Sequence, residues 1–213
     1  SRIAEQIKAT KKTFGKGYEG GARRSTFAEA AEVEEVPLEA MIEREPITVV
    51  CSRMGWIRAM SGHIDLSREL KFRDGDGPRF VFHAETTDKI LIFGANGRVY
   101  TLAAANLPGG RGMGEPVRLM VDLPNEAEIV ALFIHRPGAK LLVASEEGNG
   151  FVVPEEDVLA QTRTGKQVLN VGGGKARVCV PVQGDHVAVV SQNRKLLVFP
   201  LEDLPEMGRG KGV

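Results

Sequence analysis

Basic side chains stand beside glycine at several places in this chain, and this combination suits the binding of phosphate groups. The clearest examples are residues 109–114, which include Arg111, and residues 208–212, which include Arg209 and Lys211. Glycine lets a backbone approach a phosphate closely, and exposed N–H groups add donors to the side-chain charge. Tight turns alone could also demand these glycines, but their recurrence in register favours a binding role.

The basic residues of these loops form a set of candidate phosphate contacts. Those expected to matter most are Arg111, Arg163, Lys166, Arg209 and Lys211, followed by Arg68, Lys71, Arg118, Lys175 and Arg177. Each repeat supplies its basic residues from an equivalent place, so we expect an arc or ring of positive charge on the rim of the fold. Acidic residues concentrate elsewhere, for example at Glu146 and Glu147.

These loops belong to a repeating unit made of an apolar strand, a tight turn, a second strand and the basic loop. The turns are anchored at Gly55, Gly97, Gly148 and Arg194, which recur at intervals of about 40 to 50 residues. A self-similar β unit cannot bury its apolar face alone, so several units must stack. We therefore predict an all-β, propeller-like repeat domain with about four visible blades, open or truncated.

A short leader with helical and coil segments precedes this domain. Residues 1–24 hold seven basic residues against two acidic ones, and Ile3 and Ile7 fall on one helical face before glycines break the pattern. Residues 29–45 are rich in glutamate and read as a connector. The predicted division is a leader at 1–43 and a repeat domain at 44–213, with blades near 44–85, 86–135, 136–182 and 183–213, the last incomplete.

The overall charge does not by itself indicate a nucleic-acid partner, because the chain has 28 basic and 28 acidic residues. Binding to duplex DNA without sequence reading depends on Lys and Arg releasing counterions, which a locally basic face can provide. No apolar stretch is long enough to span a bilayer. Cys51 and Cys179 stand in β-branched runs, where buried free thiols are expected. We expect a cytoplasmic protein with no membrane partner.

No residue set in the sequence points to catalysis, a metal or a cofactor. Residues 172–175 faintly resemble an ATP-binding loop, but Ala176 stands where Ser or Thr is needed. The four histidines lack metal-ligand spacing, so hydrogen bonding at strand ends is expected of them. Tyr100 is expected in the core. Trp56 follows a hairpin turn and could stack on a DNA-facing surface, but we favour core packing for it.

Several runs resemble the C-terminal domain of the bacterial topoisomerase IV A subunit, which is paralogous to that of the gyrase A subunit. They are residues 49–58 with Gly62 and His63, residues 111–116, 148–151 and 204–212. Residues 11–15 and 21–26 are similar to the end of the coiled-coil arm before that domain. The resemblance covers essentially the whole chain. It implies a β-pinwheel, whose blades exchange strands and which binds and bends duplex DNA around its rim.

Gyrase-type domains carry the run Gln-Arg-Arg-Gly-Gly-Lys-Gly for tight wrapping, and residues 108–114 and 207–212 are only degenerate versions of it. The resemblance therefore implies DNA bending that directs supercoil relaxation and decatenation during chromosome segregation, without chiral wrapping. It implies a non-catalytic part of an ATP-dependent type II topoisomerase, nucleoid-associated in the cytoplasm. Its partners would be double-stranded DNA, the A-subunit dimer and the ATPase B subunit, with ATP and Mg bound elsewhere. The family's domain usually continues further, so we expect a shortened or truncated version here.

Three alternative interpretations stay open. A propeller that serves only as a protein-interaction module would have the same repeat and charge, but apolar rims in place of Gly-Arg loops. A propeller enzyme is the weaker rival, because no carboxylate, histidine or metal cluster recurs in the sequence. The basic stretch of the leader could also dominate any DNA affinity by itself.

Overall fold

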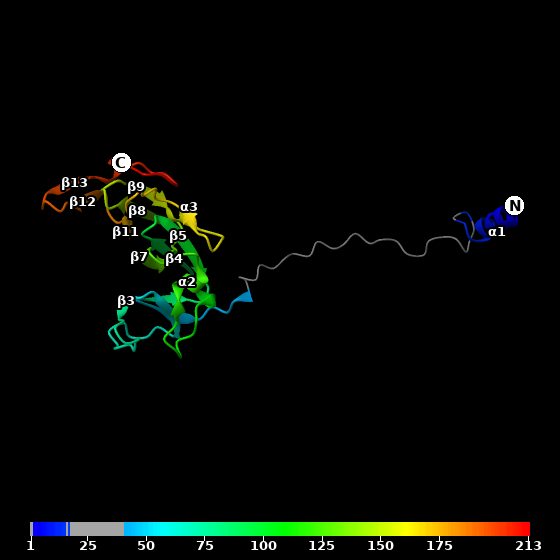
Figure 1. Ribbon diagram of the computed structural model, residues 1–213, viewed down its shortest axis with the longest axis horizontal. Helices are drawn as coiled ribbons and strands as arrows, with labels where there is room; N and C mark the ends of the chain where they lie inside the picture. The colour runs from blue at the N-terminus through cyan, green and yellow to red at the C-terminus, as the bar shows by residue number, and fades with distance from the viewer. Residues whose placement is uncertain (1, 16, 18–40) are drawn as a thin grey trace. The chain divides into compact units, whose positions relative to one another are not determined.

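The computed structural model describes residues 2–15, 17 and 41–213 (Figure 1). The chain divides into two units, Ser1–Pro37 and Leu38–Val213, and each is considered by itself. The basic pair Arg23 and Arg24 lies outside the described residues, as does most of the glutamate-rich connector predicted for residues 29–45.

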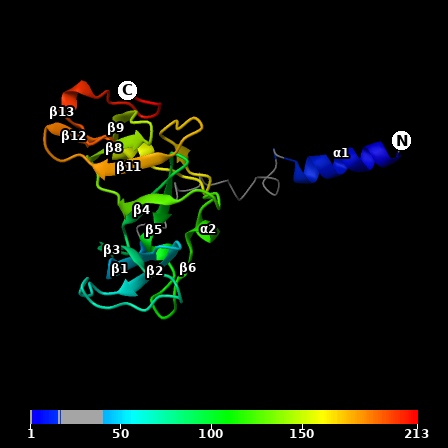
Figure 2. The ribbon, with the colours of Figure 1, turned by 60° about the vertical axis from the view of Figure 1, so that its left-hand side comes forward.

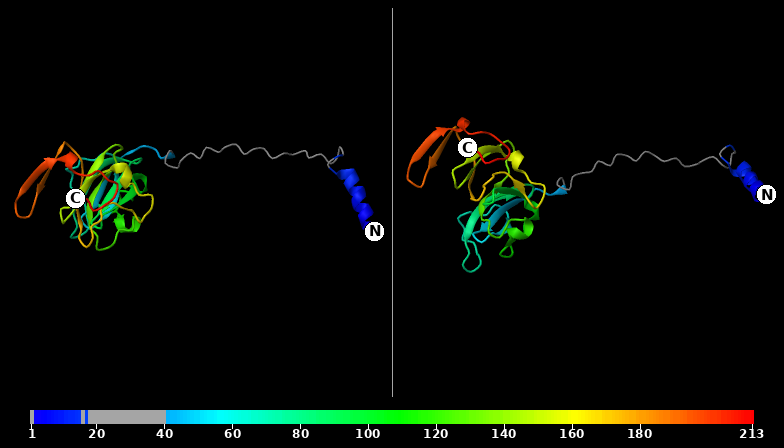
Figure 3. Two further views of the ribbon diagram at one scale, coloured as in Figure 1. Left: turned by 90° about the horizontal axis from the view of Figure 1, so that it is seen from above. Right: turned by 45° about the horizontal axis from the view of Figure 1, so that its top comes forward.

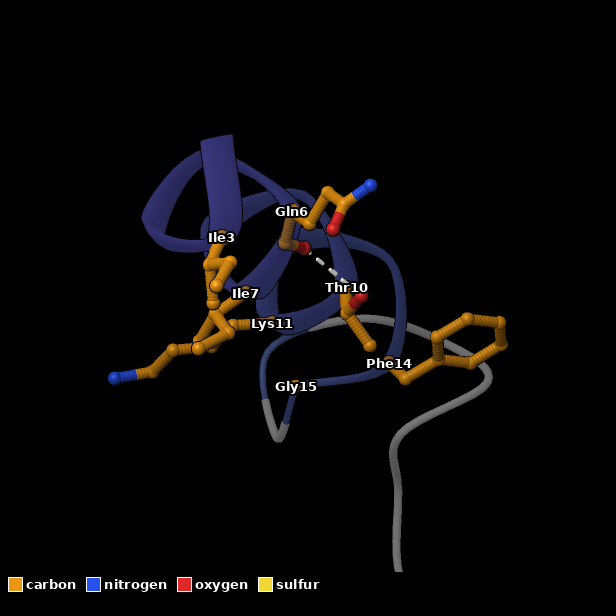
Figure 4. Close-up of a pocket in the computed structure, with 7 residues that line it drawn as sticks. All are labelled: Ile3, Gln6, Ile7, Thr10, Lys11, Phe14 and Gly15. Atoms are coloured by element: carbon orange, nitrogen blue, oxygen red, sulfur yellow. Dashed lines mark hydrogen bonds between the residues drawn. The ribbon is translucent and has the colours of Figure 1, made fainter. Parts of the chain in front are cut away.

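The described part of the first unit is essentially the helix α1 (Arg2–Phe14). Its apolar side chains Ile3, Ile7 and Phe14 are all exposed, and Ile3 and Ile7 lie along the same side of the helix (Figure 4). The Thr10 hydroxyl donates to the carbonyl of Gln6 at 2.9 Å. The helix ends at glycine, because a side chain at position 15 would place its Cβ only 2.3 Å from the carbonyl oxygen of Lys11.

Four antiparallel hairpins follow one another in the second unit (Figure 2). They are β1 (Pro46–Ser52) with β2 (Trp56–Ser61), β4 (Lys89–Gly94) with β5 (Arg98–Ala103), β8 (Lys140–Ser145) with β9 (Gly150–Pro154), and β12 (His186–Val190) with β13 (Leu196–Pro200). Their strands are rich in Val, Ile, Leu and Phe, which suit a pleated, buried surface.

The same turn closes all four hairpins. Gly55, Gly97, Gly148 and Arg194 have φ values of 79°, 75°, 86° and 63°. In each case the N–H donates to the carbonyl three residues earlier, at 2.9 to 3.0 Å. Arg194 is the one non-glycine residue with positive φ in the described part of the chain. This conformation is strained for residues with a Cβ, which explains why the other three turns use glycine.

The first two hairpins gain a strand on each side, and the third gains a strand on one side and a paired segment on the other. On the first-strand side, β3 (Pro78–Glu85) pairs with β1, β7 (Ile129–Ile134) with β4, and β11 (Ala176–Pro181) with β8. On the other side, β6 (Glu115–Pro116) pairs with β2 and β10 (Lys166–Gln167) with β5. In the third blade, Gly150 and Val213 exchange two backbone hydrogen bonds of 2.8 and 3.0 Å. The segments β6, β10 and Val213 each come from the chain after the next hairpin, so neighbouring blades exchange strands.

Two apolar clusters fill the spaces between the first three blades, and β4 contributes to both. Ile90 and Ile92 belong to the cluster shared with the first blade, whereas Leu91 and Phe93 belong to the cluster shared with the third. All four are fully buried. Successive side chains of a strand point to opposite faces, so a strand between two neighbours must be apolar on both. Tyr100 is also fully buried, which confirms its predicted place in the core.

Short helical segments connect the strands: η3 (Ala104–Asn106), α2 (Val117–Met120), α3 (Glu155–Val158) and η4 (Leu201–Asp203). Within the described residues, β12 and β13 pair only with each other, and no strand joins this sheet to the first. The blades therefore form an open series, from which the β12–β13 hairpin projects (Figure 3). The predicted all-β, propeller-like fold with a helical leader is confirmed.

Candidate nucleic-acid interface

The three basic loops that follow the second, third and fourth hairpins each cross to the second hairpin strand of the preceding blade. The loop at 107–114 lies along β2, where the Ala59 N–H donates to Pro108 at 2.8 Å. The loop at 159–166 lies along β5, where the Ala160 N–H donates to the Thr101 hydroxyl at 2.9 Å. The loop at 204–212 lies along β9, where the Val152 N–H donates to Pro205 at 3.0 Å. Basic residues are thereby delivered to equivalent edges of three successive blades.

Glycine is required where these loops meet the neighbouring strand. Gly114, Gly165 and Gly212 all have positive φ. A Cβ at these positions would lie 2.3, 2.7 and 2.2 Å from backbone oxygens of the preceding blade. The backbone geometry of strand exchange therefore requires these three glycines, and phosphate binding is not needed to explain them. Gly109 differs, because a Cβ there would meet nothing within 4 Å, so its backbone can still approach a phosphate.

Several predicted contacts have free, exposed side chains. Arg111 and Arg209 stand on the first and third of these loops, Lys166 begins β10 at the end of the second, and Arg68 and Lys175 lie on other loops. None of these side chains has an ion pair or a hydrogen bond within residues 41–213. An unpaired cation can exchange its water and counterions for a phosphate without first breaking a protein contact. The first three therefore leave one available positive charge on each of three successive blades.

Arg163 is partly engaged with the protein itself. Its Nη2 donates to the carbonyl of Leu119 at 2.6 Å, and its Nε lies 3.9 Å from the Asp122 carboxylate. The Asp122 N–H in turn donates to the carbonyl of Arg163 at 2.9 Å. Because the Arg163 side chain remains mostly exposed, it links its loop to the end of α2 and still faces solvent.

Two predicted contacts have acidic partners at the β8–β9 turn. Arg177 lies 3.6 Å from the carboxylate of Glu146, and Lys211 lies 3.4 Å from that of Glu147. Glu146 also accepts a hydrogen bond from the N–H of Lys175 at 3.0 Å. The positive charge of the third blade is therefore partly neutralised.

Arg118 is occupied by backbone carbonyls. Its guanidinium donates to the carbonyls of Pro124, Asn125 and Ala127 at 3.4, 3.1 and 2.8 Å. The side chain is half-buried. Because its donors are already used to hold the 124–127 loop, Arg118 is a weaker candidate for a phosphate contact than the exposed residues.

Two arginines that the sequence reasoning missed support the contact loops. Arg58 donates to the carbonyls of Gly112 and Lys71. Arg98 donates to the carbonyl of Thr164 at 2.9 Å and to that of Gly165 at 3.1 Å. The available signal was an arginine inside an otherwise apolar strand, since such a charge must find partners when it is buried.

Core packing, the role that the sequence favours for Trp56, is wrong. Trp56 is half-buried and belongs to neither apolar cluster. The guanidinium of Arg73 lies 3.5 Å from the centre of its ring, which is a close cation–π contact. Arg73 therefore covers one face of the Trp56 ring, and that face is unavailable for stacking on a nucleic-acid base.

The histidines make the hydrogen bonds predicted for them. The His63 and His83 rings are stacked 4.5 Å apart, and their Nε2 atoms lie 3.0 and 2.6 Å from the carbonyl oxygens of Ala84 and Ile64. His135 contacts Glu155 at 3.0 Å. In the part of the chain that the structure describes, no group of three or more His, Cys, Asp or Glu residues could hold a metal ion.

The cysteines are free and buried, as expected. Burial raises the pKa of both the Cys51 and Cys179 thiols to about 12. These thiols are therefore unreactive at neutral pH. None of the described helices is long and apolar enough to cross a membrane.

Comparison with known proteins shows similarity to one family. A family model described as the DNA gyrase C-terminal domain, beta-propeller, matches residues 88–136, 139–178 and 185–213. The A subunit of DNA topoisomerase 4 from Caulobacter vibrioides is 51% identical over 195 residues, which are 91% of this chain and 26% of that protein. The counterpart in Rickettsia bellii is 43% identical over 213 residues, or 99% of this chain and 29% of that protein. The chain thus spans less than a third of these relatives.

Solved structures show the same architecture. The E. coli ParC C-terminal domain is 31% identical, with a TM-score of 0.73 over 79% of this chain and 70% of that domain. The C-terminal domain of a DNA topoisomerase IV is 17% identical, with a TM-score of 0.71 over 81% of this chain and 57% of that one. At that identity, the second likeness supports the fold alone.

Proposed function

Because this chain belongs to the family of DNA gyrase C-terminal domains, we propose that it binds and bends duplex DNA as the C-terminal domain of a type IIA topoisomerase A subunit. The observation that carries this proposal is that each of three successive blades offers an exposed, unpaired cation on the segment that crosses to it from the next blade. They are Arg111 and Arg209 on their loops and Lys166 at the start of β10. A duplex is a regular line of phosphates, so cations repeated from blade to blade can contact it without reading its sequence.

Bending is favoured over wrapping by two features. The wrapping motif is degenerate in residues 108–114 and 207–212. On the third blade, Glu146 and Glu147 neutralise part of the charge that a longer DNA path would require. A short contact on a curved row of loops deflects the duplex, whereas a full turn needs continuous positive charge.

The parent enzyme would use this domain to engage one DNA segment during supercoil relaxation and decatenation. The relatives above are A subunits of DNA topoisomerase 4. On this basis, the partners we propose are the A-subunit dimer and an ATPase B subunit. Cleavage, ATP and Mg would then belong to other domains or subunits. The enzyme would work in the cytoplasm, associated with the nucleoid.

The test is binding of this chain to linear duplex DNA across a salt series, with and without residues 1–43. We expect affinity that survives the deletion and falls with salt at a slope of about −0.9 per phosphate neutralised. Arg111→Glu and Arg163→Glu should abolish most of it. Loss of affinity with the leader alone would place the contact on the basic segment before the blades.

A protein-interaction module without DNA binding is the second candidate. The observation that favours it is the β12–β13 hairpin, whose Val190, Leu196 and Leu197 side chains are 72%, 64% and 60% exposed. Apolar side chains in such numbers on one exposed element are typical of a protein contact. Absence of DNA binding even at low salt would favour this candidate.

A further inference from the structure

Arg58 connects two loops that are distant in sequence. Its side chain lies in β2 and is only 6% exposed. Its Nη1 donates to the carbonyl of Gly112 at 2.7 Å, and its Nη2 donates to the carbonyl of Lys71 at 2.8 Å. The guanidinium also stands over the Phe72 ring, 5.6 Å from its centre.

Both loops carry candidate DNA contacts. The loop at 66–73 carries Arg68 and Lys71, and the loop at 107–114 carries Arg111, the residue next to Gly112. Because one planar guanidinium holds both backbones, the separation of Lys71 and Arg111 is set by the rigid fork of its donors. Neither of these two exposed side chains has a partner of its own in residues 41–213 that would hold it in place.

A buried arginine in a strand needs an explanation. Burial of a charge is costly unless the group is paired or hydrogen-bonded. Within the described residues no carboxylate pairs with Arg58. Its partners are the carbonyls of Lys71 and Gly112, the Met113 sulfur at 4.0 Å and the ring of Phe72. An apolar side chain would fill the same space but could not join the two loops.

We propose that Arg58 is a positioning residue for DNA binding, which spaces Lys71 and Arg111 so that both reach phosphates of one duplex. This inference rests on the proposed DNA binding of the domain. Arg58 itself stays buried and acts through the two loop backbones.

The test uses Arg58→Lys in the full chain. Lysine keeps the charge, but its single nitrogen lacks the planar fork that holds two carbonyls apart. We expect affinity for a linear duplex to fall about tenfold at 0.1 M salt. The salt slope should become shallower by roughly 0.9 to 1.8, which corresponds to one or two lost phosphate contacts.

A matched control separates positioning from stability. Glu155 is 1% exposed and holds the 135–139 turn, where it accepts hydrogen bonds from His135 and the Arg136 N–H, and it touches neither contact loop. Glu155→Gln should lower the melting temperature and leave the salt slope unchanged. A purely structural role of Arg58 would give this same pattern, and that result would overturn the proposal.

A double-mutant cycle with Arg111→Gln provides the second measurement. If Arg58 acts through Arg111, the combined loss of affinity is smaller than the product of the two separate losses. Independent losses would contradict the proposal. Should Arg58→Lys fail to fold, Phe72→Leu removes the ring that the guanidinium stands over, so that Arg58 is held less firmly on its two carbonyls. That variant should lose affinity less, again with a shallower slope, and an unchanged slope would overturn the proposal. If the unmodified chain does not bind DNA, the proposed function fails, and this inference fails with it.

Discussion

The carboxylate of Glu146 lies 3.6 Å from the guanidinium of Arg177, so a cation of the third blade already has an acidic partner. The neighbouring Glu147 is 3.4 Å from Lys211 in the same way. One pair joins the β8–β9 turn to β11, and the other joins it to the loop at 204–212. All four side chains are well exposed, and ion pairs of this kind contribute little to stability, about 0–1 kcal/mol each. A phosphate can therefore compete for these cations.

The double substitution Glu146→Gln and Glu147→Gln should raise DNA affinity. It removes two negative charges beside the contacts and frees Arg177 and Lys211 for phosphate. We expect a gain of about threefold to tenfold at 0.1 M salt and a steeper salt slope. Fluorescence anisotropy with a labelled duplex measures both quantities.

The control for this prediction is Glu126→Gln, an exposed carboxylate on the loop before β7. It removes one negative charge without a cationic partner in the described residues and should leave the slope unchanged. Equal affinity of the double variant and the unmodified chain would place the DNA path away from the third blade.

Replacement of Gly165 by alanine should destabilise the domain by about 2 kcal/mol or more. The residue has a φ of 67°, and a Cβ there would lie 2.7 Å from the carbonyl oxygen of Val99 and 2.6 Å from the Tyr100 ring. Gly138→Ala is the matched control, because Gly138 has a φ of 77° with nothing within 4 Å. It should lose only the conformational part, about 1 kcal/mol. Urea unfolding of both variants gives the two free energies, and equal losses would mean that the crossing at Val99 can relax.

The buried thiols predict a loss of stability at alkaline pH. Burial raises the pKa of Cys51 and Cys179 from 9.0 to about 12. Below pH 9 the thiols are protonated in both the folded and the unfolded chain, so the free energy of unfolding has not yet lost anything to their ionisation. Above pH 9 the unfolded chain releases protons that the folded chain retains, so the free energy of unfolding falls towards pH 12. Unfolding curves of a Cys51→Ala and Cys179→Ala variant should show a weaker decline between these pH values.

The repeat was predictable because it depends on local patterns. Hairpin turns need positive φ, and Gly55, Gly97 and Gly148 indicate that need in the sequence itself. The apolar runs around them are long enough to indicate strands buried on both faces, as β4 shows. Resemblance of several motifs to a known family then supplied strand exchange, which no local pattern contains.

Side-chain partners between blades were not predictable in the same way. Whether a basic residue is free, as Arg111 is, or occupied, as Arg118 is, depends on which backbone segments the fold brings to it. Arg58 reaches Gly112 across 54 positions, and Arg98 reaches Thr164 across 66. Composition and spacing report the charge of a loop, whereas contacts between distant segments decide whether that charge is available.

The last prediction separates a structural arginine from a DNA contact. Arg118→Gln removes donors from the carbonyls of Asn125 and Ala127 on a half-buried side chain. Loss of such partners costs about 1–3 kcal/mol, so the free energy of unfolding should fall by an amount in this range. The salt slope of DNA binding should remain that of the unmodified chain, since Arg118 does not project to solvent as Arg111 does. Arg111→Gln should do the reverse, with unchanged stability and a slope shallower by about 0.9. A shallower slope for Arg118→Gln with intact stability would mean that Arg118 leaves its carbonyls to bind phosphate, and the assignment of this residue to the protein scaffold would be wrong.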